Sequence, residues 1–185
     1  MSLLPKPRPG WRAMSDEEKN HTWDRFYEKF DFRASPYASD WPSIIEPTPS
    51  VTFDLSAPSI GPDLPLAFAA LNAEALRCFV WALPEISELS ALDWQHTAWW
   101  FNPRLDDAPT QWDDLERSQP TVFPDGDYFA FLNTDMSEGT FGHPWEQTLC
   151  VMGDRLIDTL GKSLALWLPV LRVNGKPATD DDRDS

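Results

Sequence analysis

The side chains of this sequence that could perform acid–base chemistry gather in three short stretches. They are Asp93-Trp-Gln-His96, Pro124-Asp-Gly-Asp127-Tyr128 and Phe141-Gly-His-Pro-Trp-Glu146. Imidazole titrates near neutral pH and a neighbouring carboxylate can orient it, so a histidine–carboxylate group can transfer protons or hold a small molecule. If the strands that carry these stretches pair as neighbours, their ends converge. The predicted pocket consists of His96, Asp127, His143 and Glu146, lined by Trp94, Tyr128 and Trp145.

The same residues also have a purely structural interpretation. The two histidines would hydrogen-bond backbone groups at strand ends, Asp125 and Asp127 would close an Asx-type turn, and Glu146 would pair with a base. A catalytic zinc ion needs three protein ligands, and neither Glu146 nor Asp127 stands at a spacing that matches a known ligand frame. The sequence therefore predicts no metal and no cofactor, assigns no catalytic residue, and leaves both interpretations open.

Motifs of the common enzyme classes are absent from the sequence. It contains no Gly-rich phosphate loop, no G-x-S-x-G, no H-E-x-x-H, no paired C-x-x-C and no kinase signature. Cys78 and Cys150 both have apolar neighbours, which predicts two buried free thiols and a cytoplasmic location rather than an oxidising compartment. Apolar flanks also raise a thiol pKa, which argues against Cys150 as a nucleophile.

The net charge of −15 limits the classes of partner. Such a field repels phosphate backbones and anionic membrane surfaces, so neither nucleic acid nor membrane is expected as a partner. Strong acidity can serve solubility alone, or it can steer a basic protein partner into contact. The predicted partner-binding surface is an acidic loop with one aromatic anchor, namely Asp106, Asp107, Trp112, Asp113, Asp114 and Glu116.

Periodicity and capping signals predict three helices. The first begins at the capping box Ser15–Glu18 and runs to about Phe30, with apolar residues spaced along one face. The second begins at Asp63 and ends before Pro84, and the third begins at Asp154. Strands are expected at 51–55, 89–101, 128–132 and 141–152, the last interrupted at Pro144.

Strands that follow one another in sequence favour antiparallel pairing. The sequence therefore predicts an α+β fold: an antiparallel sheet of about four to six strands with about three helices on one face, in two layers. Ten Trp and eleven Phe are expected to fill its core. The predicted organisation is a Pro-rich lead-in at 1–14, a single domain at 15–173 and an acidic disordered tail at 174–185.

Four segments of the sequence carry a resemblance to a known family. They are W-D-R-F-Y-E-K-F-D-F (23–32), A-L-D-W-Q-H (91–96), P-D-G-D-Y (124–128) and F-G-H-P-W-E-Q-T-L-C-V-M-G (141–153). Together they resemble a bacterial family catalogued as domain of unknown function 2716, over about residues 23–171. The resemblance implies a small intracellular bacterial protein and supplies no catalytic residue.

Two functional hypotheses follow. The first is a non-enzymatic binding protein of the immunity or inhibitor type, directed against a basic partner and supported by the charge and the missing motifs. The alternative is a small-molecule enzyme or ligand-binding protein that uses the predicted histidine, carboxylate and tryptophan pocket. A purely structural or assembly role is a third possibility.

Overall fold

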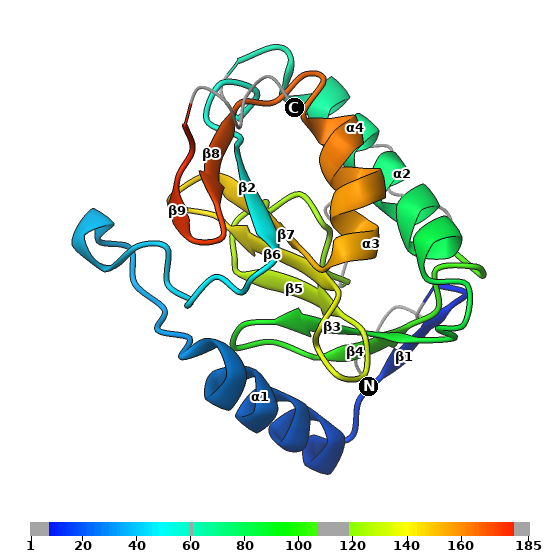
Figure 1. The fold of residues 1–185 in the computed structure, drawn as a ribbon. Coiled ribbons are helices and arrows are strands. Elements are labelled where there is room, and N and C mark those ends of the chain that lie inside the picture. The colour runs from blue at the N-terminus through cyan, green and yellow to red at the C-terminus, as the bar shows by residue number, and fades with distance from the viewer. Residues whose placement is uncertain (1–7, 60, 107–118, 180–185) are drawn as a thin grey trace.

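The protein is built on one antiparallel sheet with helices on both of its faces (Figure 1). A computed structural model describes residues 8–59, 61–106 and 119–179. The nine strands follow the order β1-β4-β3-β5-β6-β7-β2-β8-β9. The predicted α+β class with three helices is confirmed, but the sheet has nine strands rather than four to six.

Most strands are short because turn residues interrupt the apolar runs. The segment 89–101 folds as a hairpin of two strands, since Gln95 adopts a left-handed φ of 66° between them. The strands are β1 (Trp11–Ala13), β2 (Ser50–Asp54), β3 (Leu89–Asp93), β4 (Trp99–Phe101), β5 (Phe129–Leu132), β6 (Gly139–His143), β7 (Thr148–Met152), β8 (Val170–Val173) and β9 (Lys176–Pro177). Because β1 falls in the predicted lead-in and β9 in the predicted tail, the sheet extends beyond 15–173 in both directions.

The first helix, α1 (Asp16–Phe30), has the predicted capping box. Ser15 Oγ accepts a hydrogen bond from the Glu18 amide, and the Glu18 carboxylate accepts one from the Ser15 amide. Its inward face buries Trp23, Phe26 and Phe30. This face fixes which side of the helix remains in contact with solvent.

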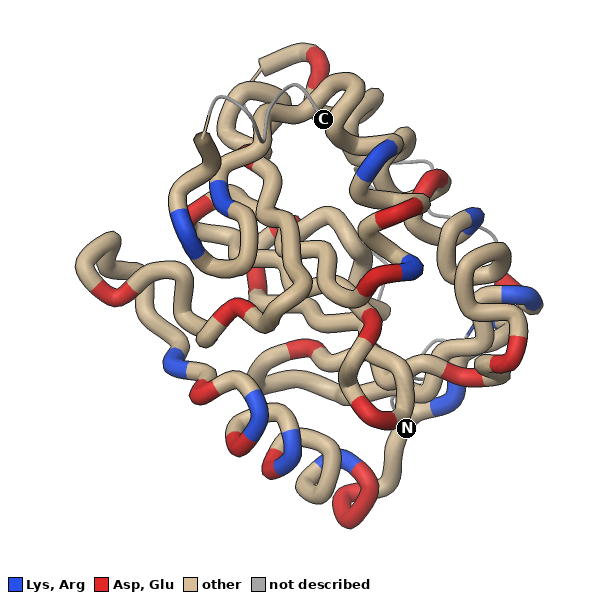
Figure 2. The backbone as a smooth tube through the Cα atoms, in the orientation of Figure 1, with Lys and Arg blue, Asp and Glu red and all other residues tan. Residues whose placement is uncertain are grey.

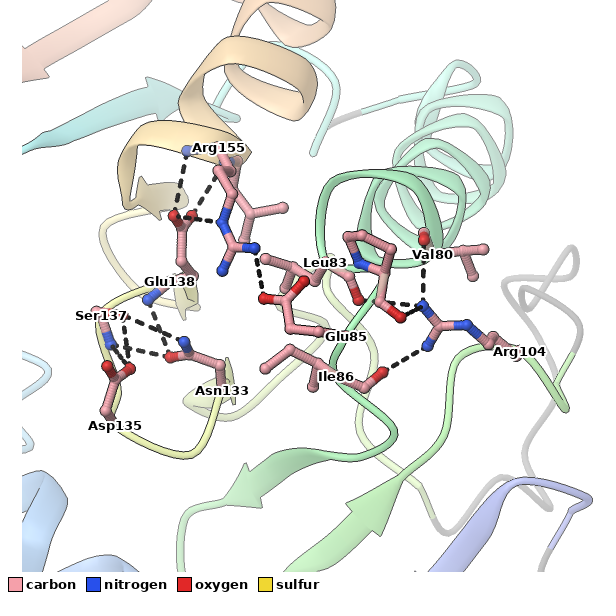
Figure 3. Close-up of polar contacts among 12 residues, drawn as sticks. Val80, Leu83, Glu85, Ile86, Arg104, Asn133, Asp135, Ser137, Glu138 and Arg155 are labelled. Atoms are coloured by element: carbon pink, nitrogen blue, oxygen red, sulfur yellow. Dashed lines mark hydrogen bonds and ion pairs between the residues drawn. The ribbon is translucent and has the colours of Figure 1, made fainter.

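The second helix, α2 (Leu64–Ala82), begins with Pro65 in its first turn, as predicted. Length and composition alone would allow it to cross a membrane. Its inward residues are buried with the sheet, for example Phe79 beside Phe131 with ring centroids 5.8 Å apart, so α2 is a core helix of the domain. Figure 3 shows how its carboxyl end is satisfied: the Arg104 guanidinium donates to the carbonyl oxygens of Val80, Leu83, Pro84 and Ile86.

The third helix spans three consecutive segments, α3 (Asp154–Leu156), the π-helical turn η2 (Ile157–Gly161) and α4 (Lys162–Leu164). The cap for its first turn comes from another part of the chain. The Glu138 carboxylate accepts the amide of Arg155 at 3.2 Å and that of Leu156 at 3.0 Å (Figure 3). Gly153 makes room for this carboxylate, because a Cβ at that position would collide with it.

Two separate cores lie on the two faces of the sheet, which corrects the prediction of two layers with helices on one face. The α2 core contains the inward residues of α2 and of the third helix, and the α1 core contains those of α1. Successive strand residues alternate between them: Phe129 and Phe131 belong to the α2 core, and Ala130 and Leu132 to the α1 core.

Phenylalanine, more than tryptophan, fills these cores. Among the described tryptophans, Trp11, Trp23 and Trp99 are buried, whereas Trp81, Trp145 and Trp167 are exposed. The largest fully buried aromatic side chains are Tyr128, Phe26, Phe30, Phe53, Phe68, Phe79 and Phe123. The physical reason is that an indole is large and carries an N–H that needs a partner, so it is rarely buried completely.

We expect Glu138→Ala to destabilise the fold by about 2 kcal/mol, because two amides of the third helix lose their acceptor in a site that is buried. Urea unfolding measures this as a lower midpoint with an unchanged slope. Glu138→Gln keeps an acceptor oxygen and should cost less than the alanine variant. Equal stability of Glu138→Ala and the wild type would contradict this account of the cap.

Candidate functional site

All three predicted stretches lie at one end of the sheet. Strand pairing sets Asp93 opposite Phe129, Phe129 opposite Gly142, and His143 opposite Thr148. The ends of β3 and β6 and the starts of β5 and β7 therefore lie at the same end of the sheet. The sequence correctly brought these segments together through the assumption that neighbouring strands pair.

The alternation of side chains divides the predicted pocket between the two faces of the sheet. Asp93 pairs with Phe129, which belongs to the α2 core, so its side chain lies on the α2 side. His143 stands two residues beyond Phe141, which belongs to the α1 core, and so lies on the α1 side. The geometry corrects the expectation of a single pocket: there are two clusters, one on each side.

The first group is the Asp–His–Asp cluster, formed by Asp93, His96 and Asp127. His96 Nδ1 lies 2.9 Å from Asp93 Oδ1 and 3.3 Å from Asp127 Oδ2. Burial raises the pKa of Asp93 to about 6, and the charges of Asp127 and Asp125 add to the effect. The hydrogen bond that His96 donates to the Asp93 carboxylate raises the pKa of His96, and burial raises the pKa of Asp127. Two carboxylates thus compete for one imidazole proton at a partly open surface.

The second group is a buried, linear chain of hydrogen bonds that runs from the Glu146 amide to the Ser35 carbonyl oxygen. The backbone amide of Glu146 donates to His143 Nδ1 at 3.0 Å, so the proton of the neutral ring resides on Nε2. Nε2 then donates to Ser43 Oγ at 3.0 Å, and Ser43 donates to the Tyr128 hydroxyl at 3.2 Å. Tyr128 donates in turn to the carbonyl oxygen of Ser35 at 2.9 Å. These hydrogen bonds hold the connector, the segment around residues 35–43 that connects α1 to β2, against the sheet.

This tautomer decides what the Ser43–His143 pair can do. A histidine that activates a serine must accept the hydroxyl proton, but Nε2 of His143 already donates to Ser43. Burial also lowers the pKa of His143 to about 4, so the ring stays neutral. Both side chains are buried as well. The pair resembles a catalytic dyad in distance, but the proton on Nε2 does not suit His143 as a general base for Ser43.

Glu146 belongs to an ion-pair network beside this chain. Arg172 from β8 donates to both carboxylate oxygens of Glu146, at 2.6 and 2.9 Å, and to Glu46 Oε1 at 2.8 and 2.9 Å. Thr52 adds a hydrogen bond to Glu46 Oε1. One guanidinium therefore bridges the connector, the turn between β6 and β7, and strand β8. This agrees with the structural expectation that Glu146 pairs with a base.

The aromatic members of the predicted set surround Tyr128 on the α1 side. The rings of Trp94 and Trp145 lie 5.8 and 5.1 Å from the Tyr128 ring, and Trp145 is the exposed one. These rings therefore lie on the same side of the sheet as His143 and Glu146, not on the side of His96 and Asp127. The functional role of this set remains a prediction.

The acidic loop proposed as a partner surface lies almost entirely outside the described residues; only Asp106 falls within them. Its carboxylate accepts a hydrogen bond from Trp11 Nε1 and forms an ion pair with Arg8 at 3.0 Å. The Asp106 side chain is only 5% exposed, so it is engaged within the chain. Asp107, Trp112, Asp113, Asp114 and Glu116 lie outside the described residues.

Sequence reasoning missed three important residues at this end of the sheet. Asp93 belonged to a highlighted stretch, and its i, i+3 spacing to His96 across a turn was the available signal. Ser43 and Arg172 carried no such signal, because their partners are 100 and 26 residues away in sequence.

We expect the lowered pKa of His143 to appear in the pH dependence of the free energy of unfolding. The ring has a pKa of about 4 when folded and about 6.5 when unfolded, so the unfolded state alone takes up a proton between these values. The free energy of unfolding therefore falls as pH drops from about 6.5 to about 4, by up to about 1.4 kcal/mol per pH unit. His143→Gln should remove this contribution, so the free energies of unfolding of the wild type and the variant should differ by an amount that changes between about pH 6.5 and about pH 4. The raised pKa of Asp93 acts in the opposite direction in both proteins, so parallel profiles would contradict the assignment.

We also expect both thiols to be unreactive in the native protein. Burial raises the pKa of Cys78 to about 11 and that of Cys150 to about 12, so almost no thiolate is present near pH 8. An aromatic disulfide reagent should label neither within minutes, and both after unfolding in denaturant. Rapid labelling of one native cysteine would identify it as a reactive group. The prediction that both cysteines are free and buried is confirmed.

Comparisons with known proteins place the chain in a family. A relative in Bacillus subtilis (strain 168), the uncharacterized protein YxiI, is 27% identical over 154 residues, which cover 81% of this chain and 91% of the relative. No solved structure matches the chain. The model of the family described as "Protein of unknown function (DUF2716)" matches residues 13–157, a region that contains α1, α2, strands β2 to β7 and both clusters. This chain therefore belongs to the DUF2716 family of proteins of unknown function.

Proposed function

We propose that this protein is a non-enzymatic binding protein that holds a basic protein partner, in the manner of an immunity or inhibitor protein. The observation that carries the proposal is the segregation of charge on α1. The cations of α1 contact backbone carbonyl groups of the sheet layer, whereas three of its carboxylates are exposed to solvent. The chain as a whole carries a net charge of −15. A face of this kind attracts a cationic surface and speeds its encounter.

Three exposed carboxylates form the outer face of α1. Glu17, Asp24 and Glu28 are all exposed. At 100° per residue, positions 17, 24 and 28 fall within about 40° of one another around the helix axis. They lie opposite the buried face that contains Phe26. Figure 2 shows the acidic positions of α1 along its outer edge. This arrangement offers a row of anions over about three turns of helix.

The cations of α1 are occupied by contacts with backbone carbonyl groups of two sheet turns. Lys19 donates to the carbonyl oxygen of His96, Arg25 to that of Thr134 at 2.7 Å, and Lys29 to that of Asp135 at 2.9 Å. These contacts hold α1 on the sheet and leave the acidic face without a neighbouring cation of the same helix. A basic partner would therefore meet carboxylates that α1 itself does not neutralise.

The chemistry of the described residues supports binding rather than catalysis. His143 keeps its proton directed at Ser43, and both thiols are buried with raised pKa values. The alternative of a small-molecule pocket keeps His96 and Asp127 but loses the second histidine to the opposite side of the sheet. We place the encounter in the cytoplasm, where two free cysteines remain reduced.

The test uses the proteins encoded by the flanking genes, each purified in a catalytically inactive form and titrated by calorimetry. We expect one basic product to bind, with an affinity that falls at least about tenfold between about 50 and about 300 mM salt. The triple variant Glu17→Gln, Asp24→Asn, Glu28→Gln should weaken this binding by a further factor of about ten or more.

The matched control makes the same change of net charge elsewhere. Asp63→Asn, Glu88→Gln and Asp154→Asn are substitutions at exposed positions outside α1, and this variant should bind nearly as well as the wild type. Equal weakening in both triple variants would show that only the net charge matters and would overturn the assignment to α1. Absence of binding by every flanking product would overturn the proposed function itself.

A further inference from the structure

We propose that the Asp–His–Asp cluster is a binding site for a divalent transition-metal ion such as Zn²⁺, with one ligand atom each from Asp93, His96 and Asp127. The three ligand atoms lie within 4.8 Å of one another. The inference is independent of the proposed partner, because it rests on the turns after β3 and before β5 rather than on α1.

The spacing of the ligand atoms suits a metal ion. Two ligands at about 2.1 Å from a zinc ion are about 3.0 to 3.4 Å apart, depending on the coordination geometry. His96 Nδ1 lies 2.9 Å from Asp93 Oδ1 and 3.3 Å from Asp127 Oδ2. The carboxylate oxygens of Asp93 and Asp127 lie within 4.8 Å of each other, and an ion at this position would hold them at ligand spacing. It takes the place of the proton on Nδ1, which is released to solvent.

The cluster contains more acceptors than donors. A single Nδ1–H gives one linear hydrogen bond, and the shorter contact is the one to Asp93. Asp127 uses its Oδ1 to accept the amide of Tyr128 at 2.8 Å, and this bond directs Oδ2 at the imidazole ring. Two carboxylate oxygens and one nitrogen thus lie close together, and the single Nδ1 proton cannot form a good hydrogen bond to both oxygens. A dication satisfies all three at once.

The fold holds the ligands in place before any ion arrives. The amide of His96 donates to the carbonyl oxygen of Asp93 at 3.2 Å, which closes the turn that carries both residues. Pairing of Asp93 with Phe129 brings Asp127 alongside. Asp93 is buried, so its carboxylate has few alternative positions. Ligands that are already in position reduce the loss of side-chain entropy on binding.

The surroundings define the class of ion. Asp125 adds negative charge, whereas the Lys19 ammonium, which binds the carbonyl oxygen of His96, opposes a cation. The imidazole favours Zn²⁺ over Mg²⁺, which prefers oxygen ligands in octahedral geometry. The His96 side chain is 63% exposed, so the remaining coordination positions face water or an added ligand group. The sequence predicted no metal because neither Glu146 nor Asp127 stands at a known ligand spacing, and Asp93 was not considered as a ligand.

Calorimetric titration of the chelator-treated full chain without an affinity tag tests the site, with ZnCl₂, MnCl₂ and MgCl₂ as probes. We expect one Zn²⁺ per chain, weaker Mn²⁺ binding and no saturable Mg²⁺ binding. His96→Gln and Asp127→Asn should each weaken Zn²⁺ binding at least about tenfold. Neither residue is buried, so both variants should unfold at nearly the wild-type midpoint without metal.

The control is His21→Gln, which removes the exposed histidine of α1 and should leave Zn²⁺ binding unchanged. Binding of Co²⁺ provides a second readout, since its visible absorption should be lost in His96→Gln and kept in His21→Gln. The proposal is overturned if the wild type shows no saturable Zn²⁺ binding. It is overturned equally if His96→Gln binds as tightly as the wild type, or if His21→Gln loses as much affinity.

Discussion

In β3, β5, β6 and β7 every residue is buried, and the side chains of these strands enter two different cores in alternation. An ionisable side chain in the middle of such a strand would lie in an apolar core without water, at a cost of several kcal/mol. Carboxyl and imidazole groups on these strands therefore stand at the strand ends, as Asp93 and His143 do. The same alternation that fills the cores separates these two residues, and so it decides which groups can act together.

The helices could be predicted from the sequence almost to the residue, because their signals are local. The capping box at Ser15 and the proline in the first turn of α2 both operate within a few residues. The sheet was harder to predict. The edge strands β1 and β9 contain three and two residues, too few for a periodic pattern. The two-layer prediction failed because a run such as Phe129–Leu132 is apolar on both faces, which indicates burial without saying which helix covers which face.

For the candidate site, the sequence predicted that the three stretches meet at one end of the sheet, but it did not predict how their side chains divide between the two faces. Pairing of neighbouring strands sufficed for the first result. The grouping required the register, since a shift of one residue exchanges the faces. The direction of the hydrogen bond between His143 and Ser43 depends on a backbone amide at Glu146, which no side-chain pattern reveals. Long-range contacts such as that of Arg172 with Glu46 leave no trace in composition or spacing.

Each core contains one thiol, Cys78 on the α2 side and Cys150 on the α1 side, and the chain has no other cysteine. An alkylating reagent can reach either sulfur only when the layer above it opens. The ratio of the two alkylation rates therefore reports whether the helical layers loosen separately or in one cooperative step. The sheet thus has one cysteine on each side whose alkylation rate reports on that side. A molecule bound to α1 would slow the alkylation of Cys150, and the rate at Cys78 would serve as the internal reference.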